Sequence, residues 1–594
     1  MPRLGFCRQS RMTLSNRLIY RLSALPIAVI GLLAGVQPAI AAQDKSAPTR
    51  IDRFDGDDQE TKRPTVRVEE LGAPGVGSVG TLSDANGGLG TDLWRGATAA
   101  GIAREMERLP RRNHSQALHD VQRRLLLTTA LAPAGKGVSG PTGPSLTQAR
   151  LQALNAMGAT ADVLALAART KVTHIKPYPV IRASFLVGKH KQGCAAASAI
   201  EKPEAGGFIE QALIACHILL GVSERAEIAL RLLHEQGTPP SKPFEAAVLA
   251  AVAGEAPARI GKPYALAVAL LRHSKVKVGT VTVRHLPTGV LVALPDLPGM
   301  ARQLRIKAAE VAAMRGAPVD SDLAILYAGA SVSAARIESA GSIRLRNFDT
   351  RARTRLYLAA AGADDVPKRL RLLSAWWRLA AGAGRRNGSS AEMLAARLTT
   401  PFLKNIKPAT AYQDHAAHIA RAYFATGRVE AALSWYRLIK NAPFRNPADL
   451  HRISAAAVLA GPTNGKTIEA WIDYKHRHEP KIAARHVADL KALLEGLGRM
   501  QVFGRVWSRR DASAQDSADD ASGARDGRYG QLRAAAATGK RGLTILHVLT
   551  LIAGRSLNDI PRGLLRESVA SLRAVGLTRE ARQLAVEAAL LRRL

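Results

Sequence analysis

A recurring glycine spacing constrains the fold of this 594-residue chain more than any other feature. In residues 416–443, AAHIARAYFATGRVEAALSWYRLIKNAP, Tyr423 lies four residues before Gly427. Ala432 follows that glycine by five residues, and Tyr436 comes four residues later. This spacing is typical of two antiparallel helices: glycine permits a tight turn, alanine is small where the helices cross, and aromatic rings fill the adjacent space. The segment therefore predicts a helix hairpin.

Similar spacing recurs around three other glycines. Gly221 is followed by Ala226 and Leu230, Gly576 lies among Leu572, Ala581 and Ala585, and Gly158 lies between Leu154 and Val163. Four such matches at irregular separations predict degenerate helix-turn-helix repeats. The segment around Gly427 resembles a tetratricopeptide unit, although Ala417 and Ala420 replace the consensus Trp and the first-helix Gly.

A wider resemblance rests on FIEQALIACHILLG at 208–221, followed by RLLHEQG at 231–237. With these segments the chain resembles uncharacterised exported α-helical-repeat proteins of Gram-negative bacteria, some of which are labelled antifreeze glycopeptide polyprotein. The chain has no Ala-Ala-Thr tripeptide array that would support this label. The resemblance implies an exported α-solenoid and no particular activity.

The composition agrees with an all-α fold, because aromatic residues make up only 4% of the chain while Ala and Leu dominate. We predict an α-solenoid with a disordered N-terminal arm. The expected organisation is a signal peptide at 1–41, a disordered linker at 42–92, a helical-repeat solenoid at 93–505, a low-complexity linker or loop at 506–540, and a C-terminal helical cap at 541–594. Residues 273–283, HSKVKVGTVTV, alternate valine with polar residues and are interpreted as an extended connector without a partner strand.

The first 41 residues have the layout of a secretory signal peptide. Five arginines and no acid accompany the apolar run LSALPIAVIGLLAGV at 22–36, and Ala39-Ile40-Ala41 is a small-x-small cleavage site. The run is shorter than the roughly 20 residues of a spanning helix, and Pro26 interrupts it. We expect export to the periplasm by the general secretory route, with an uncleaved inner-membrane anchor as the alternative. Met12 is a second possible start, and no later apolar run is long enough to span a bilayer.

The chain is strongly basic, with a formal net charge of +36. Removing the leader with its five arginines leaves +31. Such a surplus predicts affinity for polyanions. In an exported protein these are envelope polymers such as lipopolysaccharide or peptidoglycan, and nucleic acid is not an expected physiological partner. The alternative is that arginine-rich helix faces only keep the protein soluble.

Two cysteines remain after the leader, Cys194 and Cys216. Between them the sequence predicts a helix end, a loop at 203–207 and a second helix, a hairpin that can bring the two residues within disulfide distance. In an oxidising compartment we predict a disulfide. Two buried free thiols are the main alternative, and a redox or metal role the minor one.

Two motifs come close to known chemical sites. Residues 461–467, GPTNGKT, resemble a phosphate-binding loop, but the spacing is one residue short and the preceding segment is helical in pattern. We interpret them as an inter-repeat loop with Thr463 or Asn464 capping the next helix. His476 and His478 are two residues apart, so on a helix they would face different directions, and we predict an exposed basic segment.

No catalytic residues, metal ligands or cofactor-binding residues are predicted. The chain lacks H-E-x-x-H, G-x-S-x-G and the Glu-Ser and Gly-Leu-Met-Gln signatures of lytic transglycosylases. Two function classes follow. The first is a non-enzymatic exported scaffold that binds a protein or peptide through its repeats. The second is a binder of anionic envelope polymer through basic helix faces; an unrecognised hydrolase would need clustered carboxylates.

Overall fold

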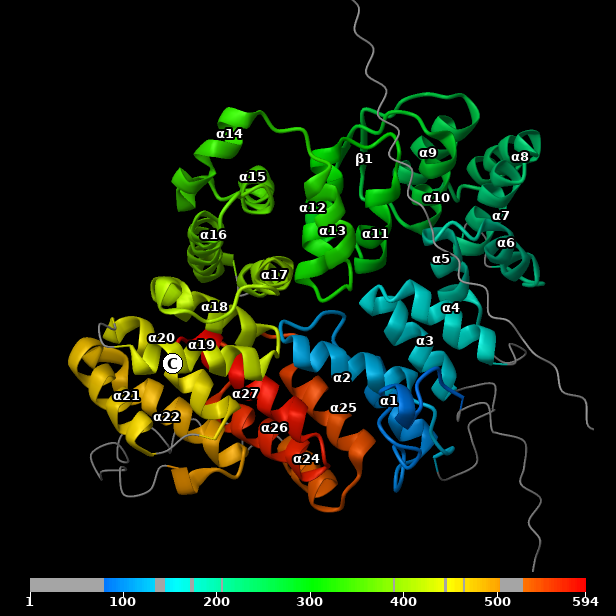
Figure 1. The fold of residues 1–594 in the computed structure, drawn as a ribbon. Coiled ribbons are helices and arrows are strands. Elements are labelled where there is room, and N and C mark those ends of the chain that lie inside the picture. Colours follow the sequence, from blue (N-terminus) through cyan, green and yellow to red (C-terminus); the bar gives the residue numbers. More distant parts are fainter. Residues whose placement is uncertain are drawn as a thin grey trace, which may run out of the picture. The chain divides into compact units, whose positions relative to one another are not determined.

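The computed structural model describes residues 79–133, 145–170, 176–203, 207–387, 390–442, 446–462, 465–502 and 527–594, all within one compact unit. These residues form an all-α helical-repeat fold, as predicted (Figure 1). The predicted signal peptide at 1–41 and the predicted arm up to residue 78 lie outside the described residues.

The first part of the fold is a run of short helices. They are η1 (Asp84–Asn86), α1 (Ala99–Glu107), α2 (Gln116–Leu127), α3 (Leu146–Met157), α4 (Thr160–Arg169), α5 (Tyr178–Leu186), α6 (His190–Ser198), α7 (Phe208–Leu219), α8 (Ser223–Glu235), α9 (Lys242–Val252) and α10 (Ala265–Ser274). η1 and the buried side chain of Leu89 show that ordered packing begins within the range predicted as linker 42–92, and Trp94, just after this range, is also buried.

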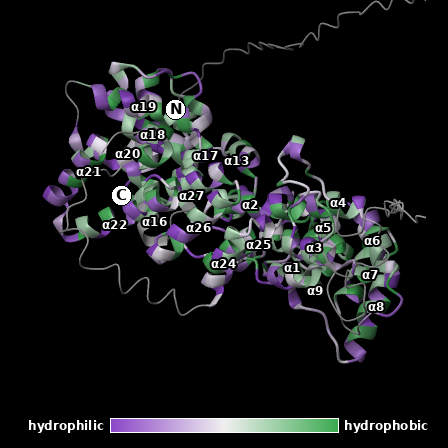
Figure 2. Ribbon diagram, turned by 90° about the horizontal axis from the view of Figure 1, so that it is seen from below, coloured by the Kyte–Doolittle hydropathy of each residue, from purple (hydrophilic) through white to green (hydrophobic). Residues whose placement is uncertain are grey.

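The middle part contains the longest helix, α16, among the described residues. Its elements are η3 (Val283–His285), α11 (Thr288–Ala293), η4 (Leu294–Asp296), α12 (Arg302–Met314), α13 (Asp320–Ala328), α14 (Ala334–Glu338), η5 (Ser339–Ser342), η6 (Leu345–Asn347), α15 (Thr350–Ala361), α16 (Val366–Asn387) and α17 (Ser390–Thr399). Most helices carry both hydrophilic and hydrophobic residues (Figure 2), as expected for amphipathic helices packed on a shared core.

The last part holds the tetratricopeptide-like hairpin and the C-terminal helices. Its elements are η7 (Thr400–Leu403), η8 (Thr410–Tyr412), α18 (Gln413–Ala425), α19 (Val429–Asn441), α20 (Pro447–Ala460), α21 (Gly465–His478), α22 (Pro480–Gly496), η9 (Met500–Val502), α24 (Gly527–Ala537), α25 (Arg541–Ile552), α26 (Arg562–Ala574) and α27 (Thr578–Arg592). Helix α24 lies inside the predicted loop 506–540, whose residues 503–526 fall outside the described part of the chain.

The described residues contain one small sheet. Strand β1 (Arg259–Gly261) pairs in parallel with β2 (Thr280–Val281). The interpretation of residues 273–283 as a connector without a partner strand is therefore wrong for residues 280–281, which pair with β1. The partner precedes helix α10, and so short a strand leaves too weak a pattern in the sequence to be recognised.

The recurring glycines lie at helix ends, in left-handed backbone conformation. Their φ angles are 70° at Gly427, 86° at Gly221, 85° at Gly576 and 79° at Gly158. In each turn the residue after the glycine donates its N–H to the carbonyl four residues before the glycine; at Gly427 this is Arg428 N–H to Tyr423 O, at 2.9 Å. This bond closes the helix end in the manner of a Schellman motif, which explains the spacing in physical terms.

The predicted packing residues of these turns are buried. Tyr423, Ala432 and Tyr436 lie between α18 and α19 and their neighbours, and Ala226 and Ala581 are fully buried in α8 and α27. Alanine at these positions leaves room for the neighbouring helix, because a larger side chain would clash with it.

Helix α27 joins distant parts of the chain. It packs against α2, α18, α20, α22 and α26 (Figure 1). Glu587 of α27 is fully buried and accepts hydrogen bonds from Ser115 Oγ at 2.5 Å and Ala117 N–H at 3.1 Å, at the start of α2. Helix α27, in the segment predicted as a C-terminal cap at 541–594, therefore contacts helices of both the first and the last parts of the chain.

Replacing Gly427 by alanine should destabilise the protein by about 1–2 kcal/mol, because an L-residue in left-handed conformation is strained. The matched control is Gly530→Ala in the interior of α24, where a Cβ meets nothing within 4 Å and φ is not positive. That change should stabilise by about 0.5–1 kcal/mol. Urea unfolding of both variants measures the difference, and equal effects would contradict the assigned turn.

Stability should depend on pH through Glu587. Burial raises its pKa from 4.5 to about 7, against the opposing effect of the bonds from Ser115 and Ala117. Between these two values the folded chain holds a proton that the unfolded chain has released, so stability falls as pH rises from about 4.5 through 7. Glu587→Gln should reduce this pH dependence of the melting temperature. The control is Glu567→Gln, at an acid that forms an ion pair with Arg533. This change should leave the pH dependence of the melting temperature in place.

Candidate functional site

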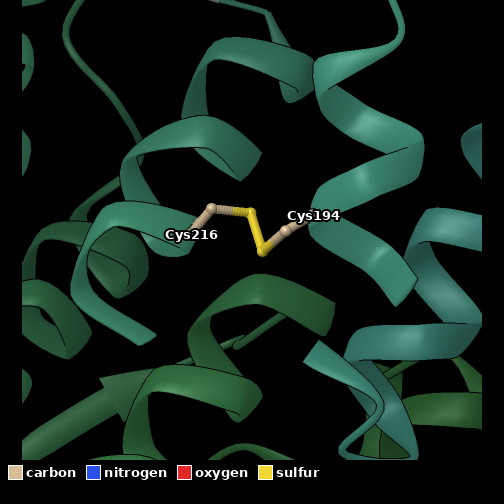
Figure 3. Close-up of a disulfide and its surroundings, with 2 residues drawn as sticks. All are labelled: Cys194 and Cys216. Carbon is tan, nitrogen blue, oxygen red and sulfur yellow. A yellow bond between two sulfur atoms is a disulfide. The ribbon is translucent and has the colours of Figure 1, made fainter. Parts of the chain in front are cut away.

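Cys194 and Cys216 form a disulfide between α6 and α7 (Figure 3). Their Cα atoms lie 5.6 Å apart, and both residues are buried. The predicted pairing is therefore present, and the alternative of two free thiols does not apply to this structure. The bridge ties the end of one helix hairpin to the next.

Helices α7–α9, beside this bridge, expose several large apolar side chains. These are Leu220, Val222, Ile228, Leu232 and Leu249, with Ile228 67% exposed. Ile228 and Leu232 are four residues apart and so share one face of α8. Among the helices, α8 makes its main contacts with α7 alone, which leaves that face without a helical neighbour.

The most distinctive cavity is strongly basic. It has a volume of about 910 Å³ and is lined by segments of α3, α5, α11, the α1–α2 connection, η3 and the turns after α12 and α25. We call it the basic cavity. Its cationic lining residues are Arg111, Arg112, Lys176, Arg182, Arg284 and Arg315, and its lining includes no Asp or Glu.

Within the described part of the chain, none of these six cations forms an ion pair with a carboxylate. Arginines elsewhere do pair: Arg123 Nε lies 2.6 Å from Asp162 Oδ2, and Arg397 Nε lies 2.8 Å from Asp320 Oδ2. A smaller cavity of about 460 Å³ has two acids in its lining, and both are paired: Lys475 Nζ lies 2.9 Å from Glu479 Oε2, and Arg421 pairs with Glu392. The basic cavity differs from this smaller one in having no carboxylate at all in its lining.

Two of the cations are held in position by the fold. The Arg315 guanidinium donates to the backbone carbonyl oxygens of Leu286 and Arg284, which fixes it against η3. Arg182 Cζ lies 4.7 Å from the centre of the Phe208 ring, a cation–π contact. Burial lowers the pKa of both guanidiniums, and the charge of Arg112 lowers that of Arg315 further.

The wall formed by α3 is lined by neutral polar side chains instead of cations. Gln148, Gln152 and Asn155 contribute side-chain amides there, spaced at i, i+4 and i+7 on one helix face. Tyr178, at the start of α5, adds an aromatic ring that packs 6.3 Å from Phe208. The cavity therefore combines guanidinium forks, which bind phosphate or carboxylate groups, with neutral hydrogen-bonding groups.

A second cavity contains a serine–histidine pair. Ser374 Oγ lies 3.0 Å from His415 Nδ1 in a space of about 520 Å³. Ser374 belongs to the interior of α16, where the backbone N–H groups are bonded within the helix and cannot stabilise an oxyanion. Burial lowers the pKa of His415. The pair consequently offers no support for acyl-transfer chemistry.

The two near-miss motifs lie in helical surroundings. Gly461 ends α20 and Gly465 begins α21, while Thr463 and Asn464 lie outside the described residues. A helix thus precedes the loop where a phosphate-binding loop needs a strand. His476 and His478 are both in α21. Among the described residues no cluster of metal-ligating side chains occurs.

No helix in the described part of the chain is both long enough and apolar enough to be a transmembrane span.

Sequence reasoning missed the basic cavity because six separated chain segments build it. Two local signals were present: the acid-free run Arg111-Arg112, and the amide series Gln148, Gln152 and Asn155 in a predicted helix. Neither signal shows that the two groups face one another. The predicted repeat residues, by contrast, lie in the turns and cores of the hairpins and not in this cavity.

No protein-family model, curated protein or solved structure matches the chain.

Removing the disulfide should destabilise the protein by about 3 kcal/mol, because a bridge across a loop of this length restricts the unfolded chain. The test is the double variant Cys194→Ala with Cys216→Ala, compared with the parent by urea unfolding. Thiol labelling of the denatured, unreduced mature protein should detect no reactive thiol. Two reactive thiols would contradict the bridge.

Proposed function

We propose that this protein binds an anionic polymer of the cell envelope, such as lipopolysaccharide or peptidoglycan, through the basic cavity. The observation that carries the proposal is the set of six cations without a carboxylate partner among the described residues. The leader expected at 1–41 supports an exported, periplasmic setting, in which such polymers are the abundant polyanions.

The energetics of like charges support a bound anion. Burial and the nearby charge of Arg112 lower the pKa of Arg315, so the charged form of Arg315 is destabilised there. An anion between them would reverse this effect. Guanidinium groups suit the task because their donors match phosphate and carboxylate oxygens in bidentate geometry.

The net charge favours the same function. A formal charge of +31 after leader removal attracts polyanions over a Debye length and speeds encounter. We propose a non-enzymatic role, since the Ser374–His415 pair lacks an adjacent set of free N–H donors in its helix.

A second candidate is the exported scaffold that binds a protein or peptide partner. The exposed face of α8, with Ile228 and Leu232, supports it, because large apolar side chains at the surface mark protein contacts when they cluster. The two candidates differ in their response to salt. Binding to the basic cavity should weaken steeply with salt, whereas binding to an apolar face should change little.

Replacing Arg112 and Arg284 together by glutamine should weaken binding of lipopolysaccharide or soluble peptidoglycan fragments by at least about tenfold, because charged hydrogen bonds are lost. The salt dependence of binding should also become shallower. Titrations of the mature protein at about 50 and 200 mM salt measure both effects.

The matched control is Arg477→Gln with Arg533→Gln, two exposed arginines outside the cavity that remove the same charge. This control should retain nearly full affinity. An equal loss in both double variants would mean that net charge alone drives binding, and absence of binding in the parent would refute the proposed function.

A further inference from the structure

Gln148 is the one glutamine of the cavity wall that is almost completely buried, with 5% of its surface exposed. Neither its Nε2 nor its Oε1 has a hydrogen-bond partner in the structure. Leaving both ends of a buried amide unsatisfied costs free energy, and native proteins rarely do so without a reason.

The local sequence predicts a hydrogen bond between the Gln148 side chain and the backbone N–H of Ser145, and this bond is absent from the structure. Ser145, Leu146, Thr147 and Gln148 match a capping box, in which the glutamine side chain returns to the N–H of the capping serine. Ser145 does perform its half, since its Oγ accepts the N–H of Gln148 at 3.1 Å. Gln148 is instead one of the residues that line the cavity, together with Gln152 and Asn155 on the same face of α3.

We infer that the basic cavity takes a saccharide unit of an anionic glycan, with sugar hydroxyls on the amide row of α3 and a phosphate or carboxylate on the arginines. The inference rests on the proposed function and specifies its ligand class. A hydroxyl group both donates and accepts a hydrogen bond, so a single sugar ring can satisfy the Nε2 and the Oε1 of Gln148 together.

Two other classes of anion fit the same wall less well. Inorganic polyphosphate presents only acceptors near neutral pH, so it would leave Oε1 of Gln148 without a donor. Single-stranded nucleic acid needs several aromatic stacking surfaces, and Tyr178 is the only Phe, Tyr or Trp residue in the lining. An acidic peptide, unlike these two, offers backbone donors and acceptors to the amides and carboxylates to the arginines, so it is the competing ligand class that the experiment must separate from a glycan.

The experiment uses the variant Gln148→Met, which keeps the length of the side chain and removes its polar atoms. Calorimetric titration of the full mature protein employs four probes: a trisaccharide of galacturonic acid, a disaccharide bisphosphate, inorganic tripolyphosphate and a hexa-aspartate peptide. We expect the variant to weaken glycan binding about tenfold and tripolyphosphate binding less, since a glycan can bond both Nε2 and Oε1 of Gln148 whereas tripolyphosphate can accept only from Nε2. The two glycans distinguish carboxylate from phosphate as the anionic group.

Thermal unfolding of the free protein separates this effect from misfolding. Gln148→Met should raise the melting temperature, because it removes an unsatisfied buried amide. The matched control is Gln122→Met in α2, a fully buried glutamine whose side chain bonds to Asn113 at 2.6 Å and to the Pro110 carbonyl at 3.1 Å. This control should lower the melting temperature.

Two results would overturn the inference. One is unchanged glycan affinity in Gln148→Met; the other is tighter binding of tripolyphosphate or the peptide than of either glycan. In both cases the proposed function survives if the Arg112 and Arg284 variant still loses affinity for the anion that binds. If none of the four probes binds the parent protein, both the inference and the proposed function fail.

Discussion

A shortage of carboxylates governs how this fold is assembled. The chain has 84 lysines and arginines and only 48 acids, so each buried acid is a scarce partner. The buried ones join separate helices: Asp489 of α22 accepts from Arg562 of α26 and Arg592 of α27, both at 3.0 Å. Glu587 connects α27 to the start of α2. These links hold the C-terminal helices against the first ones, and the remaining cations must find other partners.

Many of the remaining arginines are satisfied by backbone carbonyl groups at helix ends. Arg150 is completely buried and donates to the carbonyls of Leu126, Val79 and Thr128. Arg499 does the same at the end of α20. Such contacts neutralise the unpaired carbonyls and the negative end of the helix dipole. At the basic cavity Arg315 also donates to backbone carbonyls, but no carboxylate lines the cavity, so the positive charge there is not neutralised by an acid.

The sequence predicted local structure well and long-range assembly poorly. The spacing around Gly427 identified a hairpin because a left-handed residue and its closing bond to Tyr423 lie within a few residues. The Cys194–Cys216 bridge was predictable for the same reason: it links neighbouring helices. The contact of Glu587 with Ser115 was not, since a buried acid in an amphipathic helix looks like any surface acid. The basic cavity depends on that kind of contact, because its segments come from both ends of the chain.

One glycine predicted from the sequence, Gly158, belongs both to a local helix turn and to a long-range contact beside the basic cavity. Gly158 ends α3 as a repeat turn, and a Cβ placed on it would lie 2.6 Å from the backbone N of Gly289 in α11. This close approach fixes the amide-bearing helix against the cavity wall that contains Thr288. The cavity is therefore built on tightly packed helices, while its lining includes an unsatisfied amide and unpaired cations. The unsatisfied amide and the cations without carboxylate partners each cost free energy in the unliganded protein. Two such costs in one well-packed cavity are typical of a binding site, because a ligand can remove both together.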